Sequence, residues 1–116
     1  MTDFLDALRA RRAIIMDGAV GTELYSRGIF INRCFEEANF SDQDLVRAVH
    51  REYRQAGAAL LTTNSWGANR FKLAQHNLSE RTREINTAAA HLAREIAQDV
   101  CWVAGSIGPH GQGLVD

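Results

Sequence analysis

Three short apolar segments, separated by two long amphipathic ones, constrain the fold of this chain more than any other feature. The apolar segments span residues 13–16, 58–63 and 101–105, and none alternates between apolar and polar residues. Strands without alternation are typical of parallel sheets that are buried on both faces. Amphipathic helices between successive strands pack outside such a sheet. The sequence therefore predicts an α/β fold with a parallel sheet.

The two amphipathic segments predict helices at residues 42–56 and 79–98, because apolar residues recur in both at helical spacing. The side-chain oxygen of Ser41 is expected to cap the first of these helices, and Gly57 is expected to end it. The weaker patterns predict a short helix at residues 3–11, and one or two helical turns followed by irregular chain at residues 22–40.

The length of the chain bears on which parallel-sheet architecture it can form. Its 116 residues match a single domain. An open doubly wound sheet and a (β/α)8 TIM barrel both fit the order of elements, but a barrel needs about 250 residues and three strands cannot close a ring. A barrel would therefore be incomplete here, and residues 1–116 would form its N-terminal portion, with about three strands and two main helices.

Composition excludes several classes of protein. Thirteen Lys and Arg residues against fourteen Asp and Glu residues give a net charge of −1, without the basic excess that nucleic acid or an anionic membrane surface attracts. No apolar stretch approaches the ~20 residues that span a bilayer, and the N-terminus does not resemble a signal peptide. We expect a cytoplasmic protein that binds neither nucleic acid nor membranes.

The candidate site lies where the predicted strands end, since ligands of parallel α/β folds collect at the carboxyl ends of strands. Asp17 and Gly18 follow the first strand, and Thr63, Asn64 and Ser65 end the second. Asp17 could bind a ligand's ammonium group while Gly18 lets the backbone approach it. An equally open alternative is that Asp17 caps a turn at residues 22–24. For Thr63, Asn64 and Ser65, the residues alone favour hydrogen bonding to backbone groups at the strand end over ligand binding.

Other chemistries have weak support. The segment Gly18-Ala-Val-Gly21 does not match the dinucleotide-binding pattern. His91 and Glu95, four residues apart on a predicted helix, favour a surface ion pair over a metal site. Cys34 and Cys101 lack a neighbouring base or ligand and are expected to be packed, reduced thiols.

Four segments, IIMDGAVGTELYSRG, LVRAVHREYRQAGAALLTTNSWGANRFKL, REINTAAAHLAREIA and VAGSIGP, occur in this order along nearly the whole chain. Together they resemble the N-terminal part of the homocysteine S-methyltransferase family. The sequence of these segments is similar to that of bacterial members fused to a methylenetetrahydrofolate reductase.

The resemblance implies a (β/α)8 barrel in which zinc, held by three cysteine thiolates, activates the homocysteine thiol for attack on a methyl donor. It also implies that Asp17, Gly18, Thr63, Asn64 and Ser65 line the homocysteine pocket. Neither Cys34 nor Cys101 matches the family's zinc cysteines, which are expected beyond Asp116. The 116 residues alone are therefore expected to be inactive, as part of a longer methyltransferase that forms methionine.

Two questions stay open at the level of sequence. The methyl donor could be a methylfolate, S-methylmethionine, betaine or a cobalamin carrier, and homo-oligomerisation is undecided. The chain could instead be a complete, non-enzymatic α/β module that dimerises through its open sheet edge, because an unpaired edge strand invites association.

Overall fold

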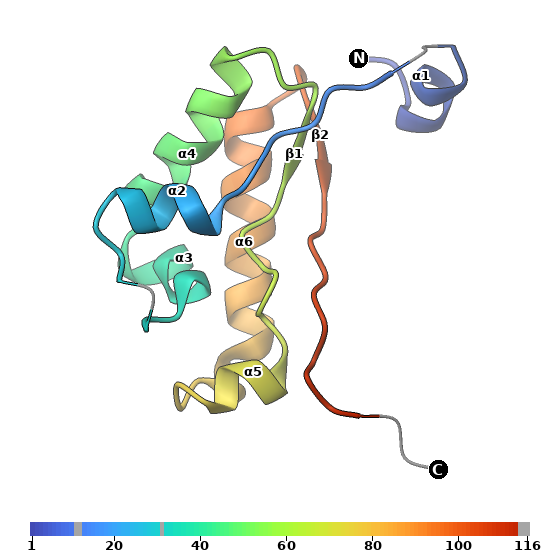
Figure 1. The fold of residues 1–116 in the computed structure, drawn as a ribbon. Coiled ribbons are helices and arrows are strands. Elements are labelled where there is room, and N and C mark those ends of the chain that lie inside the picture. The colour runs from blue at the N-terminus through green and yellow to red at the C-terminus, as the bar shows by residue number, and fades with distance from the viewer. Residues whose placement is uncertain (11–12, 31, 114–116) are drawn as a thin grey trace.

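The computed structural model describes residues 1–10, 13–30 and 32–113. Its helices are α1 (Phe4–Ala10), α2 (Gly21–Ser26), α3 (Ala38–Ser41), α4 (Gln43–Gln55), α5 (Arg70–Ala74) and α6 (Thr82–Ala97), and its strands are β1 (Leu60–Thr62) and β2 (Trp102–Ala104). Short 3-10 helices precede α3 and α6. The long helices α4 and α6 lie side by side on one face of the strands (Figure 1).

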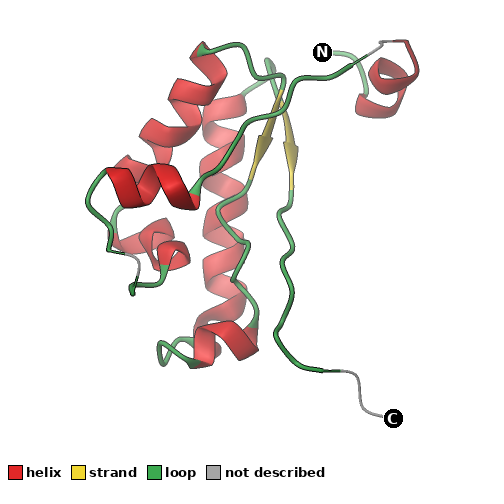
Figure 2. Ribbon diagram, in the orientation of Figure 1, coloured by secondary structure: helices red, strands yellow, loops and turns green. Residues whose placement is uncertain are grey.

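The sheet is parallel and runs in chain order. β1 pairs with β2, with Leu61 opposite Val103, and Met16 forms an isolated parallel bridge to Leu60 on the other edge of β1. Two further backbone hydrogen bonds hold that edge, from Ala59 N to Ile15 O at 2.7 Å and from Asp17 N to Leu60 O at 2.9 Å. The predicted first strand is thus an extended segment with one bridge, beside two short strands (Figure 2).

The two long helices confirm the predictions from periodicity. Residues 42–56 become α4 and residues 79–98 become α6, which begins after a 3-10 turn at Ser79–Arg81. Gly57 ends α4 with a φ of 107°, a conformation that glycine adopts without strain. The predicted Ser41 cap is wrong, because the Ser41 hydroxyl donates to Glu37 O and Asp42 is the residue preceding α4.

The core lies between the helices and one face of the sheet. Leu61, Ile96, Ala97 and Cys101 form the cluster that joins the sheet to α6. A second cluster, around Leu24, Val46, Val49 and Leu92, joins α2, α4 and α6. Burial of these apolar side chains is the main contribution to folding.

The expectation of strands buried on both faces is wrong. Ile15 is 69% exposed and Met16 is 54% exposed. Consecutive residues of an extended segment point to opposite faces, so neither face is covered at this outer segment. The face of β2 away from α4 and α6 meets α1 at one end. There Phe4 contacts Trp102 edge-on at 5.6 Å, and Trp102 Nε1 donates to Thr2 O at 3.0 Å. Among the described residues, no helix has the length and apolar character needed to cross a bilayer.

Candidate functional site

A cavity of about 550 Å³ lies at the carboxyl ends of the strands, where the sequence predicted a site. Its walls are residues 18–22 after the first extended segment, residues 62–66 at the end of β1, Phe35 with Glu36, and Ser106 after β2. Four segments that are far apart in the sequence therefore meet there. Gly18, Thr63, Asn64 and Ser65 all line this cavity, which agrees with their predicted location at strand ends.

Asp17 is not among the residues that line the cavity, although its neighbour Gly18 is, and its carboxylate is held by Thr62. One carboxylate oxygen of Asp17 accepts a hydrogen bond from Thr62 N at 2.9 Å, and the other accepts one from Thr62 Oγ1 at 3.0 Å. Asp17 is only 8% exposed. Burial raises its pKa, and the hydrogen bonds from Thr62 oppose that rise. The alternative role for Asp17, capping residues 22–24, is not seen, because α2 has no side-chain cap.

The loop after Asp17 lines the cavity through Gly18, Ala19 and Val20. Tyr53 of α4 fixes this loop by donating from its hydroxyl to Ala19 O at 2.8 Å. A Cβ on Gly18 would lie 3.0 Å from the Tyr53 hydroxyl, so glycine permits this close approach. The N–H groups of Gly18, Ala19 and Val20 donate to no described residue. They are therefore available to an acceptor in the cavity.

Thr63 and Ser65 join the end of β1 to the segment after β2. Their hydroxyl oxygens lie 2.6 Å apart. Ser65 donates to Ser106 O at 2.8 Å, and Ser106 N donates to Thr63 Oγ1 at 3.0 Å. Much of the hydrogen-bonding capacity of these hydroxyls is thus used inside the protein, and they shape the cavity wall.

Asn64 is tied to Asn39 of α3 in a buried pair of amides. Asn64 Nδ2 donates to Asn39 Oδ1 at 3.0 Å and to Phe35 O at 3.0 Å, while Asn39 Nδ2 returns a bond to Asn64 O at 2.8 Å. Both N–H groups of Asn64 are occupied. This pair fixes the segment before α4 against the end of β1.

Sequence reasoning missed Glu36, which forms part of the cavity wall. Glu36 Oε1 accepts a hydrogen bond from Gly67 N at 2.7 Å, and a Cβ on Gly67 would lie 3.0 Å from that oxygen. The second oxygen, Oε2, lies 3.5 Å from the Cys34 thiol, which donates to it. Residues 22–40 have little apolar periodicity, so the sequence carried no signal that would place Glu36 beside Gly67.

The described residues do not fit a zinc site. No group of three or more His, Cys, Asp or Glu side chains comes together among them. Burial raises the pKa of the Cys34 thiol to about 11 and also raises the pKa of the Cys101 thiol. Both cysteines are buried and free, as predicted. A zinc ligand must be a thiolate, and these surroundings favour the thiol.

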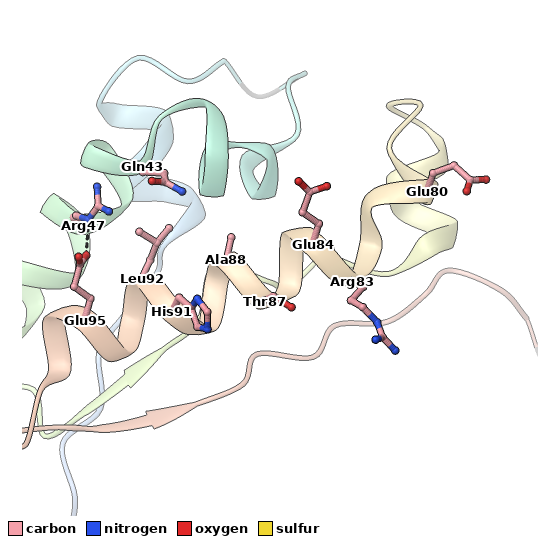
Figure 3. A pocket seen from close by; sticks show the side chains of 10 residues that line it. All are labelled: Gln43, Arg47, Glu80, Arg83, Glu84, Thr87, Ala88, His91, Leu92 and Glu95. Atoms are coloured by element: carbon pink, nitrogen blue, oxygen red, sulfur yellow. Dashed lines mark hydrogen bonds and ion pairs between the residues drawn. The ribbon is translucent and has the colours of Figure 1, made fainter.

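A second, larger cavity of about 640 Å³ lies between α4 and α6, away from the strand ends (Figure 3). Charged side chains make up about half of its wall, and Figure 3 shows Arg47 of α4 meeting Glu95 of α6. Glu95 therefore pairs with Arg47, and the predicted pair with His91 is wrong. Arg47 and Glu95 neutralise each other at the surface, and this cavity lies away from the strand ends, so the strand-end cavity is the stronger candidate for chemistry.

Comparisons with known proteins agree on one relationship. A family model described as homocysteine S-methyltransferase matches residues 14–116. The methionine synthases of Mycobacterium tuberculosis and Mycobacterium leprae are each 31% identical to this chain over 120 residues, covering 93% of it. This chain spans only about 10% of the length of either relative.

Two crystal structures of the homocysteine methyltransferase MmuM from Escherichia coli are similar in fold. The metallated form has a TM-score of 0.77 at 31% identity, and the oxidized form has a TM-score of 0.78 at 30% identity. They cover 92% and 95% of this chain, respectively, and this chain covers 42% of each.

Proposed function

This chain belongs to the homocysteine S-methyltransferase family, and we propose that it supplies part of the homocysteine pocket of an enzyme that methylates the homocysteine thiol to form methionine. The match of residues 14–116 to the family model supports this proposal. So do the names of its relatives, methionine synthase and homocysteine methyltransferase.

The proposal includes the architecture. Residues 1–116 are the N-terminal portion of a (β/α)8 barrel, with residues 13–17, β1 and β2 as its first strands and α4 and α6 as its first two main helices. Support comes from the parallel pairing in chain order and from the helices on one face. Ile15 and Met16 point to opposite faces of the sheet, so only one of them would face the barrel interior.

The substrate assignment rests on one observation: a negatively charged carboxylate and backbone N–H donors lie at the same strand end. Asp17 offers a buried carboxylate, and Gly18 with its neighbours offers free N–H donors. An amino acid carries an ammonium and a carboxylate on adjacent atoms, so the two sets can bind its two charges. A carboxylate has about four acceptor positions, so Asp17 can keep its bonds to Thr62 while accepting one from an ammonium.

Thr63, Asn64 and Ser65 are assigned to the wall of the same pocket. Their side chains hold one another, Ser106 and Asn39 in place. Their contribution is to preserve the shape of the pocket around the amino-acid head group, and this shape limits where the thiol can lie.

Zinc and the methyl donor belong to the longer enzyme in this proposal. Because Cys34 and Cys101 do not fit a metal site, the described residues are given no role in binding zinc. A methylfolate is the proposed donor. The 116 residues alone are expected to transfer no methyl group.

The test is a methyl-transfer assay on the full-length enzyme and on the 116-residue chain. Homocysteine is supplied with each of four donors: a methylfolate, S-methylmethionine, betaine and methylcobalamin. The expected result is methionine formation by the full-length enzyme with at least one donor, and none by the short chain. A full-length enzyme that makes no methionine with any donor would overturn the proposal.

One observation favours a second candidate, a non-enzymatic module that dimerises. Ile15 and Met16 are exposed on the first extended segment, and the edge of β2 that pairs with no described strand could pair with another chain. Sedimentation of the 116-residue chain distinguishes the two. A stable, discrete dimer supports the module, whereas aggregation or a loosely packed monomer supports the barrel portion.

A further inference from the structure

The loop that joins the first extended segment to α2 is held by one side chain of α4. Residues 18–20 of this loop line the strand-end cavity, whereas Tyr53 does not. The Tyr53 hydroxyl nevertheless donates to Ala19 O at 2.8 Å, between residues 34 positions apart in the sequence. Among the described residues, the only other hydrogen bond of residues 18–20 runs from Leu24 N to Val20 O, at 2.9 Å. Tyr53 is therefore the main tie between this loop and the rest of the protein.

The core of the protein fixes the position of Tyr53. This residue lies within α4, and its ring packs against the cluster around Leu24 and Val49 and against the cluster around Leu61. Because packing already orders the ring, the bond from its hydroxyl costs little further side-chain entropy. The position of Ala19 O is thus set by the core, and not by the loop itself.

The same bond orients a peptide group. The peptide between Ala19 and Val20 is trans, and a trans peptide is planar, with its C=O and its N–H pointing in opposite directions. Because Ala19 O accepts from Tyr53, the Val20 N–H points away from Tyr53. This N–H donates to no described residue, although Val20 lines the cavity. Without the Tyr53 hydroxyl, this peptide would be free to rotate.

Gly18 gives a second sign that the loop and Tyr53 fit closely. A Cβ at this position would lie 3.0 Å from the Tyr53 hydroxyl oxygen, and 3.4 Å and 3.5 Å from two carbons of its ring. The two carbon contacts are ordinary, and only the contact with the oxygen is tight. Gly18 is not one of the glycines with positive φ, so its backbone alone does not require glycine. The restriction at position 18 therefore comes from the Tyr53 hydroxyl.

We propose that Tyr53 is a positioning residue for the carboxylate of homocysteine. Its hydroxyl holds residues 18–20 in the conformation in which their N–H groups bind that carboxylate, and it restricts position 18 to glycine. Donors that are oriented in advance bind more tightly, because their ordering is not paid for on binding. The inference rests on the proposed function and deepens it, since it adds a residue that lies outside the pocket and acts through the loop.

The test is competition against homocysteine in the full-length enzyme, with two analogues that each lack one charged group. Sulfanylbutanoate keeps the carboxylate and lacks the ammonium, and aminopropanethiol keeps the ammonium and lacks the carboxylate. Tyr53→Phe should raise the KM for homocysteine and the inhibition constant of sulfanylbutanoate about fivefold, as expected for one lost neutral hydrogen bond. The inhibition constant of aminopropanethiol and kcat should stay within about twofold of wild type.

This comparison separates positioning from a merely structural role, because general damage to the pocket would weaken the binding of both analogues alike. Tyr25→Phe is the matched control. Tyr25 is the other tyrosine of the chain, it is exposed on α2, and its hydroxyl bonds to no described residue. It should leave all three constants unchanged. Equal weakening of both analogues in Tyr53→Phe, or an unchanged KM for homocysteine, would overturn the inference.

A second test begins from the opposite side of the contact. Gly18→Ala should raise the KM for homocysteine roughly tenfold, because its Cβ pushes the Tyr53 hydroxyl away from Ala19 O. The loss should again spare aminopropanethiol, so this variant tests the inference even if Tyr53→Phe does not fold. Combining Gly18→Ala with Tyr53→Phe removes the tight contact, and KM should return to that of Tyr53→Phe alone. Effects of the two substitutions that simply multiply would contradict the proposed restriction at position 18.

Wild-type activity separates this inference from the proposed function. If the wild-type enzyme forms no methionine from homocysteine with any donor, the proposed function fails. If it forms methionine and its KM for homocysteine is insensitive to Tyr53→Phe, this inference alone fails.

Discussion

Thr62 binds both carboxylate oxygens of Asp17, through its backbone N–H and through its hydroxyl. Asp17 N in turn donates to Leu60 O. The next hydrogen bond between these two segments, from Thr62 N, is accepted by the Asp17 carboxylate instead of by a backbone carbonyl. The side chain of Asp17 thus ends the sheet and is oriented by it. Thr62 lies one residue before the strand-end group that the sequence indicated.

Thr62→Val should weaken homocysteine binding and shift its pH dependence. The Thr62 hydroxyl lowers the pKa of Asp17 against the effect of burial, so its loss raises that pKa further. Binding of an ammonium needs the ionised carboxylate, and the acid limb of the affinity profile should therefore move to higher pH. Affinity near neutral pH should fall roughly tenfold, as for a lost hydrogen bond to a charged group.

The measurement is calorimetric titration with homocysteine in the full-length enzyme between pH 5 and pH 8. Thr62→Ser is the control, because serine keeps the hydroxyl, and it should stay close to wild type. An unchanged pH profile in Thr62→Val would show that Thr62 does not set the ionisation of Asp17.

His50 should make the protein less stable in acid. It is fully buried on α4, and neither ring nitrogen has a hydrogen-bond partner among the described residues. Burial lowers the pKa of His50 to about 4. Between about pH 6.5 and pH 4 the unfolded chain therefore binds a proton that the folded chain does not, and stability falls as pH falls. The loss should reach about 3 kcal/mol.

Urea denaturation at pH 7 and pH 4.5 measures this loss. Carboxylates also contribute below pH 5, so the relevant quantity is the difference between wild type and His50→Leu, which lacks the titrating ring. Wild type should lose more stability than the variant. Equal losses would mean that His50 accepts its proton without unfolding.

Gly108→Ala should destabilise the segment after β2. A Cβ there would clash with the carbonyl oxygen of Trp66 and would lie 2.7 Å from its indole ring. Gly108 N also donates to that carbonyl at 3.1 Å, so the backbone cannot move away without losing the bond. We expect a loss of about 1–3 kcal/mol in chemical denaturation. Gly105→Ala is the control, since nothing lies within 4 Å of its added Cβ.

Asn39→Ala should lower the free energy of unfolding more than substitution of an exposed amide side chain does. It removes the bonds from Asn39 Nδ2 to Asn64 O and Ile85 O, and it leaves the buried Asn64 amide without one of its acceptors. The expected cost is about 2–4 kcal/mol, because buried polar groups lose their partners. Gln55→Ala, at an exposed end of α4, should change the midpoint of unfolding little. Similar midpoints for the two variants would contradict the structural role of Asn39.

Periodicity predicted α4 and α6 because each buries a continuous apolar stripe. It could not predict α5, whose five residues are too short for a stripe, although Asn69 at its start caps it in the usual way. Asp17 and Thr63 both lie at strand ends, as the sequence indicated, although only Thr63 lines the cavity. Glu36 and Asn39 were missed because their contacts, with Gly67 and Asn64, join segments about 25–31 residues apart through irregular chain.

The exposed sheet face has a similar explanation. Apolar strands such as residues 13–16 indicate burial on both faces, yet Ile15 and Met16 remain exposed because no described element covers them. The local sequence indicates whether a strand can be buried on both faces. It does not indicate whether another element covers those faces.

The role of Asp17 in homocysteine binding is tested by calorimetric titration of homocysteine into the full-length enzyme and into Asp17→Asn. Asp99→Asn, which changes an exposed carboxylate, is the control. The asparagine keeps the shape of Asp17 and removes its charge. We expect saturable binding by wild type and by Asp99→Asn, and affinity reduced roughly 10- to 100-fold in Asp17→Asn. Equal affinities in all three proteins would show that the strand-end carboxylate is not part of the homocysteine site.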